Sequence, residues 1–207
     1  MTAASNTKPN PYADAPRLPD LPLVEPASLV RAGWPVELEI GPGRGGFLFE
    51  RLAAEPELCM LGFEIRRKWA TIIDNRLKAQ GLGERARVFY EDARTALPRL
   101  PAGSLSRIYV HFPDPWWKKR HEKRLVVSPT LLPDVVRALK PGGELFVQTD
   151  VEDRASEYEL AISEAAGLVP APGGPRLSEN PFRARSPREH RAIKDGLPIH
   201  RLLYRKQ

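Results

Sequence analysis

A regular alternation of short apolar runs with helical segments constrains the fold of this chain more than any other feature. The apolar runs occupy residues 36–40, 59–64, 86–90, 105–112 and 144–149. Segments with helical spacing of apolar residues follow or separate them, at 47–53, 67–80, 128–140 and 152–166. Strands that alternate with helices form a mainly parallel sheet. The sequence therefore predicts a doubly wound α/β fold, with a last short strand at 199–204.

A glycine-rich loop follows the first predicted strand and opens a helix, from Gly41 to Gly46. Backbone without Cβ atoms approaches a nucleotide-like ligand closely. The second strand ends at Glu64, about 20 residues beyond the loop, a spacing that places a carboxylate against ribose hydroxyls. The loop matches neither the strict dinucleotide pattern nor a P-loop. Alone it is weak evidence, because glycine-rich turns that bind nothing are common.

Acidic residues also follow the other three predicted strands, namely Asp92, Asp114 and Asp150. Because the carboxyl ends of parallel strands meet at one edge of a sheet, we expect these side chains to lie near the glycine loop. Asp92 is placed to accept a hydrogen bond from an exocyclic amine. The loop, Glu64 and Asp92 together indicate a site for an adenosine-type ligand, with Asp114 and Asp150 beside it.

The segment after the fourth strand combines a fixed carboxylate, two indoles and a cationic run. Pro113 and Pro115 stiffen the backbone on both sides of Asp114. The residues that follow are Trp116, Trp117, Lys118, Lys119, Arg120, His121, Glu122, Lys123 and Arg124. Flat aromatic surfaces beside cations suit a nucleobase on a phosphate backbone. Taken singly, each feature also has a structural explanation: a turn, a core tryptophan pair or a solvated face.

Composition narrows the class of protein. The 207 residues carry a formal charge of +6, clustered at 118–124 and 183–194, which favours an anionic partner such as nucleic acid. The single cysteine, Cys59, fits a reducing cytoplasm. The sequence has neither a membrane-spanning apolar stretch nor a signal-peptide pattern. The four histidines lack metal-ligand spacing, so we expect no metal site and a cytoplasmic protein.

The chain divides into a short arm and one domain. Residues 1–30 contain six prolines and little periodicity, which predicts a flexible arm. Residues 31–207 then form a single domain.

Two sets of residues give the chain a family resemblance. The run from Glu39 to Gly45, together with Glu64, resembles the S-adenosylmethionine site of Rossmann-type methyltransferases. The segment Phe112-Pro113-Asp114-Pro115-Trp116, with the basic residues after it and Thr149-Asp150, resembles the bacterial tRNA (guanine-N7)-methyltransferases. The resemblance covers roughly residues 36–160. It implies a Rossmann-like sheet of about seven strands, with helices on both faces and an antiparallel C-terminal strand.

The resemblance also implies an activity and the residues that carry it. The expected reaction is methylation at N7 of a guanine in the tRNA variable loop, at tRNA position 46, with S-adenosylmethionine as the methyl donor. The cofactor positions are Glu39, Gly41, Gly43, Gly45, Glu64, Asp92 and Asp114. The substrate positions are Lys118, Asp150, Ser186, Pro187, Arg188 and Glu189, and the RNA-contacting positions are Lys119, Arg120, His121, Lys123 and Arg124.

One block departs from the family pattern. Where the family carries Thr-Lys-Phe-Glu, this chain has Ser186-Pro187-Arg188-Glu189. The hydroxyl and the acid are kept, but the aromatic residue is lost and a proline is introduced. The substrate contacts at 186–189 are therefore the part of the resemblance in which this chain differs from the family.

The expected chemistry needs alignment and charge stabilisation more than a base. N7 of guanine has an available lone pair, so the sequence calls for no proton-abstracting residue. Asp114 is the candidate catalytic residue, because a nearby carboxylate stabilises the charge that the purine acquires. Asp150 is expected to accept from guanine N1–H or its amine, and Lys118 to donate to O6 or a phosphate.

The sequence leaves two alternative functions and two oligomeric states to distinguish. A small-molecule methyltransferase with the same fold, and a non-catalytic RNA-binding relative, are the alternative functions. The sequence is compatible with a monomer or a homodimer.

Overall fold

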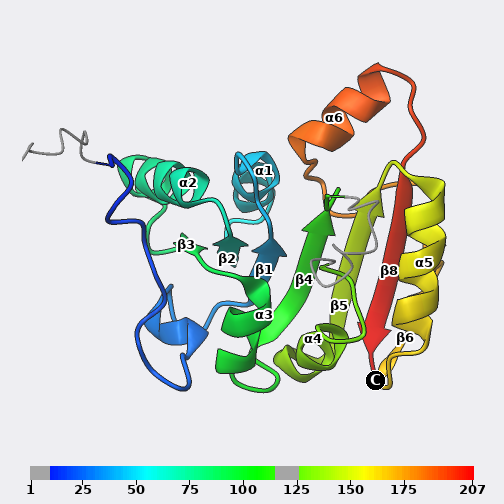
Figure 1. Cartoon of the computed structure of the whole chain (residues 1–207), viewed down its shortest axis with the longest axis horizontal. Helices are drawn as coiled ribbons and strands as arrows, with labels where there is room; N and C mark the ends of the chain where they lie inside the picture. Colours follow the sequence, from blue (N-terminus) through cyan, green and yellow to red (C-terminus); the bar gives the residue numbers. More distant parts are fainter. Residues whose placement is uncertain (1–9, 115–125) are drawn as a thin grey trace, which may run out of the picture.

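The computed structural model describes residues 10–114 and 126–207, and its centre is a mainly parallel sheet. Across Figure 1 the strands run in the order β3-β2-β1-β4-β5-β8-β6, with β7 pairing to β8. The parallel strands are β1 (Val36–Ile40), β2 (Cys59–Glu64), β3 (Ala86–Tyr90), β4 (Leu105–His111) and β5 (Leu139–Thr149). The antiparallel additions are β6 (Leu168–Pro170), β7 (Arg176–Leu177) and β8 (His200–Lys206). The predicted doubly wound fold with an antiparallel C-terminal strand is confirmed.

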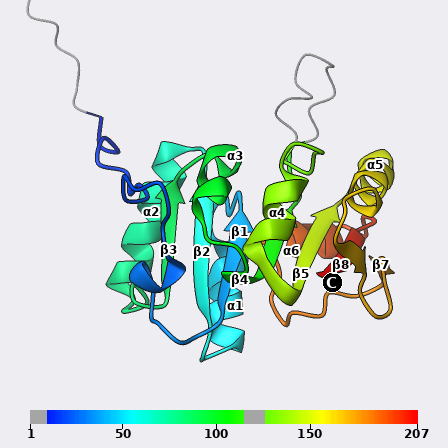
Figure 2. The same ribbon diagram turned by 90° about the horizontal axis from the view of Figure 1, so that it is seen from below.

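Helices cover both faces of the sheet. One apolar cluster packs α1 (Gly46–Ala54) and α2 (Arg67–Ala79) against one face. The other packs α3 (Ala93–Ala96), α4 (Leu132–Ala138) and α5 (Glu152–Ser163) against the opposite face. Figure 2 shows α1 and α3 on opposite sides of the strands. Two short 3₁₀ helices, η1 (Pro26–Ser28) and η2 (Leu97–Arg99), and α6 (Pro187–Lys194) complete the elements of the described residues.

A buried carboxylate ties α1 to the strands beneath it. Glu37 on β1 is 1% exposed and accepts hydrogen bonds from Arg51 Nε (2.9 Å) and Arg107 Nη1 (2.7 Å). The Tyr109 hydroxyl also donates to it, at 2.8 Å. Burial raises the pKa of Tyr109, so its hydroxyl keeps the proton that it donates. The charge is thus compensated inside the protein, as a buried carboxylate requires.

The segment expected to be a flexible arm packs against the domain from about residue 16 onward. Leu18 is 5% exposed and Val24 is 1% exposed within the larger apolar cluster. The Tyr90 backbone N–H donates to the Pro16 carbonyl, and the Leu18 N–H donates to Glu91. The prolines do keep this segment out of helices up to η1, but its few apolar residues anchor it. Part of the segment expected to be an arm therefore lies against the domain in this structure.

Three element boundaries differ from the sequence-based expectation. The helix expected at 128–140 begins at Leu132, because Pro133 is tolerated in the first turn but would break the interior of a helix begun at Pro129. The prolines and the glycine of residues 94–103 predict a connection, but residues 94–99 lie in α3 and η2. The basic region 176–195, for which the sequence predicts no helix, contains α6, which lies above the carboxyl ends of β4 and β5 in Figure 1.

Candidate functional site

Two adjoining cavities lie at the carboxyl ends of the parallel strands. The larger, of about 710 Å³, is bordered by β1, β4 and β5 on one side and by α6 on the other. The smaller, of about 350 Å³, lies towards β2 and β3. Both are lined by Gly41, Arg66, His111, Phe112, Pro113 and Asp114. Because the two cavities share this wall, a ligand in one cavity would lie next to a ligand in the other.

Glu64 and the glycine loop form one unit beside the smaller cavity. Glu64 is 2% exposed, and its Oε2 accepts from the Gly43 backbone N–H at 3.0 Å. Its Oε1 accepts from the backbone N–H of Arg66 at 2.9 Å. Gly41 has φ +73° with no atom within 4 Å of where a Cβ would be, so it leaves open space towards the ligand side. Gly45 instead packs against Ile73 and lines neither cavity.

Asp92 lies at the far end of the smaller cavity, as predicted from its strand. Its carboxylate caps α3 by accepting from the Arg94 backbone N–H at 3.0 Å and also pairs with the Arg94 side chain. The hydrogen bond from the Arg94 side chain holds the pKa of Asp92 below its ordinary value of 3.8. The group is therefore an ionised acceptor at neutral pH.

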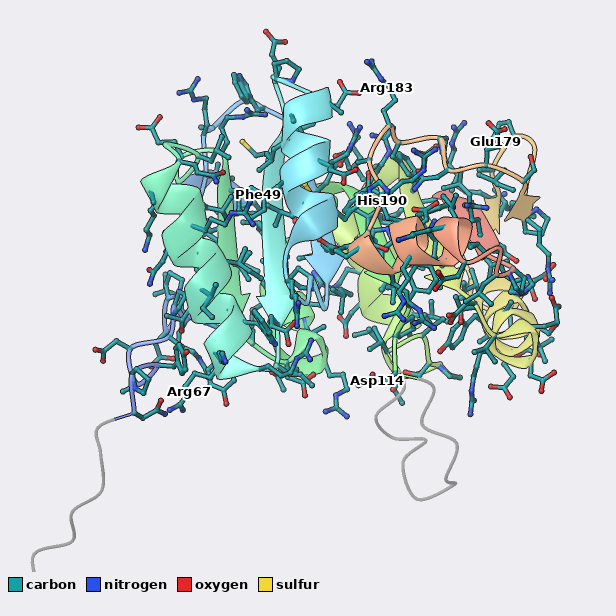
Figure 3. All side chains as sticks on the ribbon, turned by 90° about the horizontal axis from the view of Figure 1, so that it is seen from above. Phe49, Arg67, Asp114, Glu179, Arg183 and His190 are labelled. Atoms are coloured by element: carbon teal, nitrogen blue, oxygen red, sulfur yellow. The ribbon has the colours of Figure 1, made fainter. Side chains whose placement is uncertain are left out.

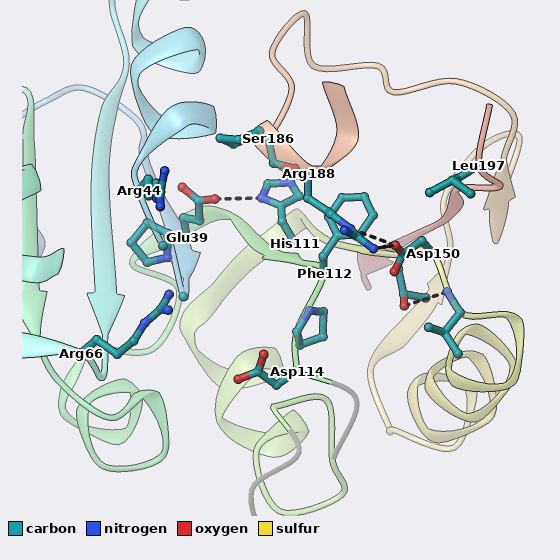
Figure 4. A pocket seen from close by; sticks show the side chains of 17 residues that line it. Glu39, Arg44, Arg66, His111, Phe112, Asp114, Asp150, Ser186, Arg188 and Leu197 are labelled. Carbon is teal, nitrogen blue, oxygen red and sulfur yellow. Dashed lines mark hydrogen bonds and ion pairs between the residues drawn. The ribbon is translucent and has the colours of Figure 1, made fainter. Parts of the chain in front are cut away.

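Glu39 and His111 form a buried pair at the inner wall of the larger cavity (Figure 4). Glu39 Oε1 lies 2.9 Å from His111 Nδ1, and both side chains are almost fully buried. An ionised carboxylate only accepts, so Nδ1 must carry the hydrogen. Within the described residues, Glu39 Oε2 has no hydrogen-bond partner. A buried acceptor of this kind requires a donor, which the described residues do not supply.

Phe112 and Asp114 form the boundary between the two cavities. Phe112 has φ +45°, a left-handed conformation that is uncommon for a bulky residue and that collects at functional sites. Its backbone N–H donates to the Gln148 carbonyl at 2.8 Å, which holds it on β5. Asp114 is exposed and lines both cavities. Figure 3 shows Asp114 at the point where the described part of β4 and its following loop ends.

At the opposite end of the larger cavity, Asp150 is paired with Arg188 (Figure 4). Arg188 Nε donates to Asp150 Oδ2 at 2.9 Å, and Arg188 Nη2 donates to the same oxygen. Ser186 and Pro187 line the cavity beside them. The divergent block 186–189 thus reaches the site through its first three residues.

Glu189, expected to contact substrate, is not on the cavity surface. It is 0% exposed and accepts from Arg201 Nη2 at 2.9 Å and Asn180 Nδ2 at 2.8 Å. The expectation of a direct substrate contact is wrong for the conformation described, because Arg201 draws the carboxylate into the protein. Glu189 instead fixes α6 in place.

The remaining predicted residues, Lys118, Lys119, Arg120, His121, Lys123 and Arg124, lie outside the described residues. Within the described ranges, no group of three or more His, Cys, Asp or Glu side chains is arranged to hold a metal ion. None of the helices in the same ranges has the length and apolar character that crossing a lipid bilayer requires.

Sequence reasoning missed the contributions of His111 and of α6. His111 read as an ordinary strand residue, and nothing in its neighbours indicated a partner on β1. The start of α6 did carry a signal: Ser186 followed by Pro187 and Glu189 matches a capping box with proline at the first helical position. Ser186 Oγ indeed accepts from the Glu189 backbone N–H at 3.1 Å.

Comparison with known proteins agrees with this geometry. Residues 34–202 match the family model Methyltransf_4, described as "Putative methyltransferase". A tRNA (guanine-N(7)-)-methyltransferase of Anaeromyxobacter dehalogenans is 41% identical over 91% of this chain and 94% of its own length. The enzyme of the same name from Myxococcus xanthus is 40% identical over 81% of each chain. The one from Rhodopirellula baltica is 35% identical over 100% of this chain and 81% of its own.

Solved structures share the fold at low sequence identity. The 16S rRNA methyltransferase KamB aligns with a TM-score of 0.60 and 17% identity, covering 87% of this chain and 90% of KamB. The [4+2]-cyclase SpnF aligns with a TM-score of 0.59 and 15% identity, and the alignment covers 87% of this chain and 77% of the SpnF chain. These likenesses establish the Rossmann-like methyltransferase fold alone, since proteins with this fold run different chemistries.

Proposed function

Because this chain belongs to the tRNA (guanine-N7)-methyltransferase family, we propose that it methylates N7 of a guanine in the variable loop of tRNA, at tRNA position 46. S-adenosylmethionine is the methyl donor, and 7-methylguanine and S-adenosylhomocysteine are the products. The observation that carries the proposal is the pair of adjoining cavities, with acids on both and Asp114 on their shared wall. One cavity suits the cofactor and the other suits a base.

The residues of the smaller cavity and its wall fit S-adenosylmethionine. Glu64 has lone pairs left for ribose hydroxyls after its bonds to Gly43 and Arg66, because a carboxylate accepts about four hydrogen bonds. Asp92 is an ionised acceptor for the adenine amine. On the adjoining larger cavity, Glu39 Oε2, buried and without a partner among the described residues, fits the ammonium of the methionine part. When bound, the cofactor supplies an electrophilic methyl carbon on a sulfonium.

The task of the protein is to align guanine N7 with that methyl carbon and to stabilise charge. N7 uses its own lone pair to form the new bond, so the protein has no proton to remove. Asp114 faces both cavities and is placed to stabilise the positive charge that the purine acquires. Phe112, which lines the same wall, restricts how a base can lie between them.

Transfer RNA as the partner explains the charge distribution. The cationic run at 118–124 begins four residues after Asp114 in the sequence, so it is close along the chain to a residue of the site. Phosphate neutralisation by such a run supplies the sequence-independent part of RNA binding. A metal-free reaction in the cytoplasm, by a monomer or a homodimer, completes the proposal. A small-molecule methyltransferase would not need the cationic run. A non-catalytic RNA-binding relative would not need the acids that line the two cavities.

The test is incubation of the protein with unmodified tRNA and labelled S-adenosylmethionine, followed by mapping of the label. We expect label on one guanine of the variable loop, seen as chain cleavage at 7-methylguanine. Label on a metabolite mixture but not on tRNA would favour the small-molecule alternative. Failure of calorimetry to detect S-adenosylmethionine binding would favour the non-catalytic one.

A further inference from the structure

The ion pair between Asp150 and Arg188 leaves one hydrogen-bonding group of each residue unused. Arg188 directs both Nε and Nη2 at the same carboxylate oxygen, Asp150 Oδ2. Within the described ranges, Arg188 Nη1 and Asp150 Oδ1 make no hydrogen bond of their own. Both residues line the larger cavity, with side chains that are 50% and 16% exposed. The pair therefore has the Arg188 Nη1 amino group left as a donor beside the Asp150 Oδ1 acceptor.

Arg188 is presented by a helix that its neighbours hold firmly. Ser186 caps the first turn, and Pro187 packs so closely on Gly46 of α1 that a Cβ there would lie 2.4 Å from its ring. Glu50 of α1 accepts from the Arg185 backbone N–H at 2.9 Å. The buried pair of Glu189 with Arg201 fixes the same turn to β8. The donor is thus pre-organised, as a base-reading group needs to be.

We propose that Arg188 and Asp150 act together as the guanine-reading element of this enzyme, with Arg188 as a specificity-determining residue. Arg188 donates to guanine O6, and Asp150 accepts from guanine N1–H. Adenine presents the opposite pattern at these two positions, an amine donor at C6 and an acceptor at N1. A donor and an acceptor in fixed order therefore admit guanine and leave adenine with two mismatched contacts.

The placement of the pair is compatible with methylation at N7. Asp150 and Arg188 line the larger cavity and not the smaller one. A guanine held through O6 and N1 by this pair keeps its N7 lone pair free to face the smaller cavity. The pair has no net charge, so Arg188 does not oppose the positive charge that N7 acquires. Arg188 stands where the family pattern has an aromatic residue, so this donor is a feature of this chain's own divergent block.

The inference rests on the proposed function, and the experiment separates the two. The target guanine of a tRNA transcript is replaced by 6-thioguanine, whose sulfur is a poorer acceptor than O6 but whose N1–H remains. The protein is compared with its Arg188→Met variant, by kcat/KM on both transcripts. If the unaltered protein does not methylate the guanine transcript at N7, the proposed function fails and the question of Arg188 does not arise.

We expect the unaltered protein to prefer guanine over 6-thioguanine, and Arg188→Met to lose most of that preference. The loss of kcat/KM on guanine should be about 10- to 100-fold, the range for one good base contact. An equal loss on both transcripts would overturn the proposal, since it would assign Arg188 a merely structural role. A higher kcat/KM of Arg188→Met on the guanine transcript would also overturn the proposal, because the ion pair would then hinder binding of the base.

Arg191→Met is the matched control, because Arg191 lies on the same helix but pairs with Asp195 and does not line the cavity. Its ratio of guanine to 6-thioguanine activity should equal that of the unaltered protein. Asp150→Asn replaces the acceptor with a donor-bearing amide and should reduce the preference for guanine over adenine in the same transcript. Thermal unfolding of each variant checks that the fold is intact.

Discussion

At the scale of single residues, Asp114 is the side chain on which the chemistry depends most. It is exposed, lies on the wall between both cavities and follows a strand whose last residue is buried. We expect Asp114→Asn to lower the single-turnover rate on the order of 100- to 1,000-fold, as loss of a charge-stabilising group does. Cofactor affinity, measured by calorimetry, should change far less. Glu57→Gln, an exposed acid at the opposite end of the sheet, should leave the rate unchanged.

His111 is a positioning residue for Glu39. His111 Nδ1 contacts Glu39 Oε1, so Oε2 is the carboxylate oxygen without a hydrogen-bond donor among the described residues. His111→Phe keeps the ring packing against Phe47 but leaves Glu39 Oε1 unpaired. We expect calorimetry to give about tenfold weaker S-adenosylmethionine binding, because an unpaired buried acceptor costs ~1–3 kcal/mol. His111→Asn, whose amide can donate in place of Nδ1, should restore much of the affinity; equal weakening by both variants would contradict this role.

The sequence predicted the position of a residue correctly where that residue directly follows a parallel strand. Glu64, Asp92, Asp114 and Asp150 each follow a parallel strand, and all four line one of the two cavities. Glu189 was misplaced because its direction depends on Arg201, a residue of another element. The partners of a carboxylate, unlike its position at a strand end, are decided by tertiary packing.

At the scale of elements, a buried carboxylate fastens α2 to β3. Asp74 is 0% exposed and accepts from Arg87 Nε at 2.8 Å and from the Val88 backbone N–H at 3.2 Å. Burial alone would disfavour its ionised form. Hydrogen bonds from Arg87 and Lys78 outweigh burial and hold the pKa of Asp74 below its ordinary value of 3.8.

The pH dependence of stability follows from that lowered pKa. A lowered folded-state pKa adds stability that is present above the unfolded value and is lost as pH falls through the folded one. We expect Asp74→Asn to lower the free energy of unfolding by about 1–3 kcal/mol at pH 7. The difference between the two proteins should stay constant down to about pH 5 and shrink below pH 3.8. Urea unfolding across pH measures it, and a difference that persisted undiminished at pH 2 would contradict the assignment.

Helix α6 marks the limit of sequence reasoning at this scale. Its eight residues carry two buried side chains, Glu189 and Ala192, so it lacks the apolar stripe from which helices are recognised. The capping signal at Ser186 was the sole local cue. The long helices α2 and α5 were predictable because each buries a regular set of apolar residues along one face.

At the scale of the whole molecule, the alternation of strands and helices determined the parallel half of the sheet but not its other end. Strands β1 to β5 are parallel, as strands joined by helical crossovers are, in the order β3-β2-β1-β4-β5. The insertion of β8 between β5 and β6 joins segments far apart in sequence, and no local pattern encodes that pairing. This insertion places α6, and with it Arg188, over the site.

The distribution of charge predicts how the whole protein associates with tRNA. Replacing Lys119, Arg120, Lys123 and Arg124 with glutamine should weaken tRNA binding, because fewer phosphates are neutralised. Each cation removed from a phosphate should also lower the salt slope of the binding constant by about one unit. Filter binding between 50 and 200 mM salt, a range chosen to resolve the slope, measures the change. Lys140→Gln removes an exposed charge at the amino end of β5, away from the cavities, and should leave the slope as it is. An unaltered slope in the fourfold variant would make the cationic run a passive surface and would assign tRNA binding to other residues.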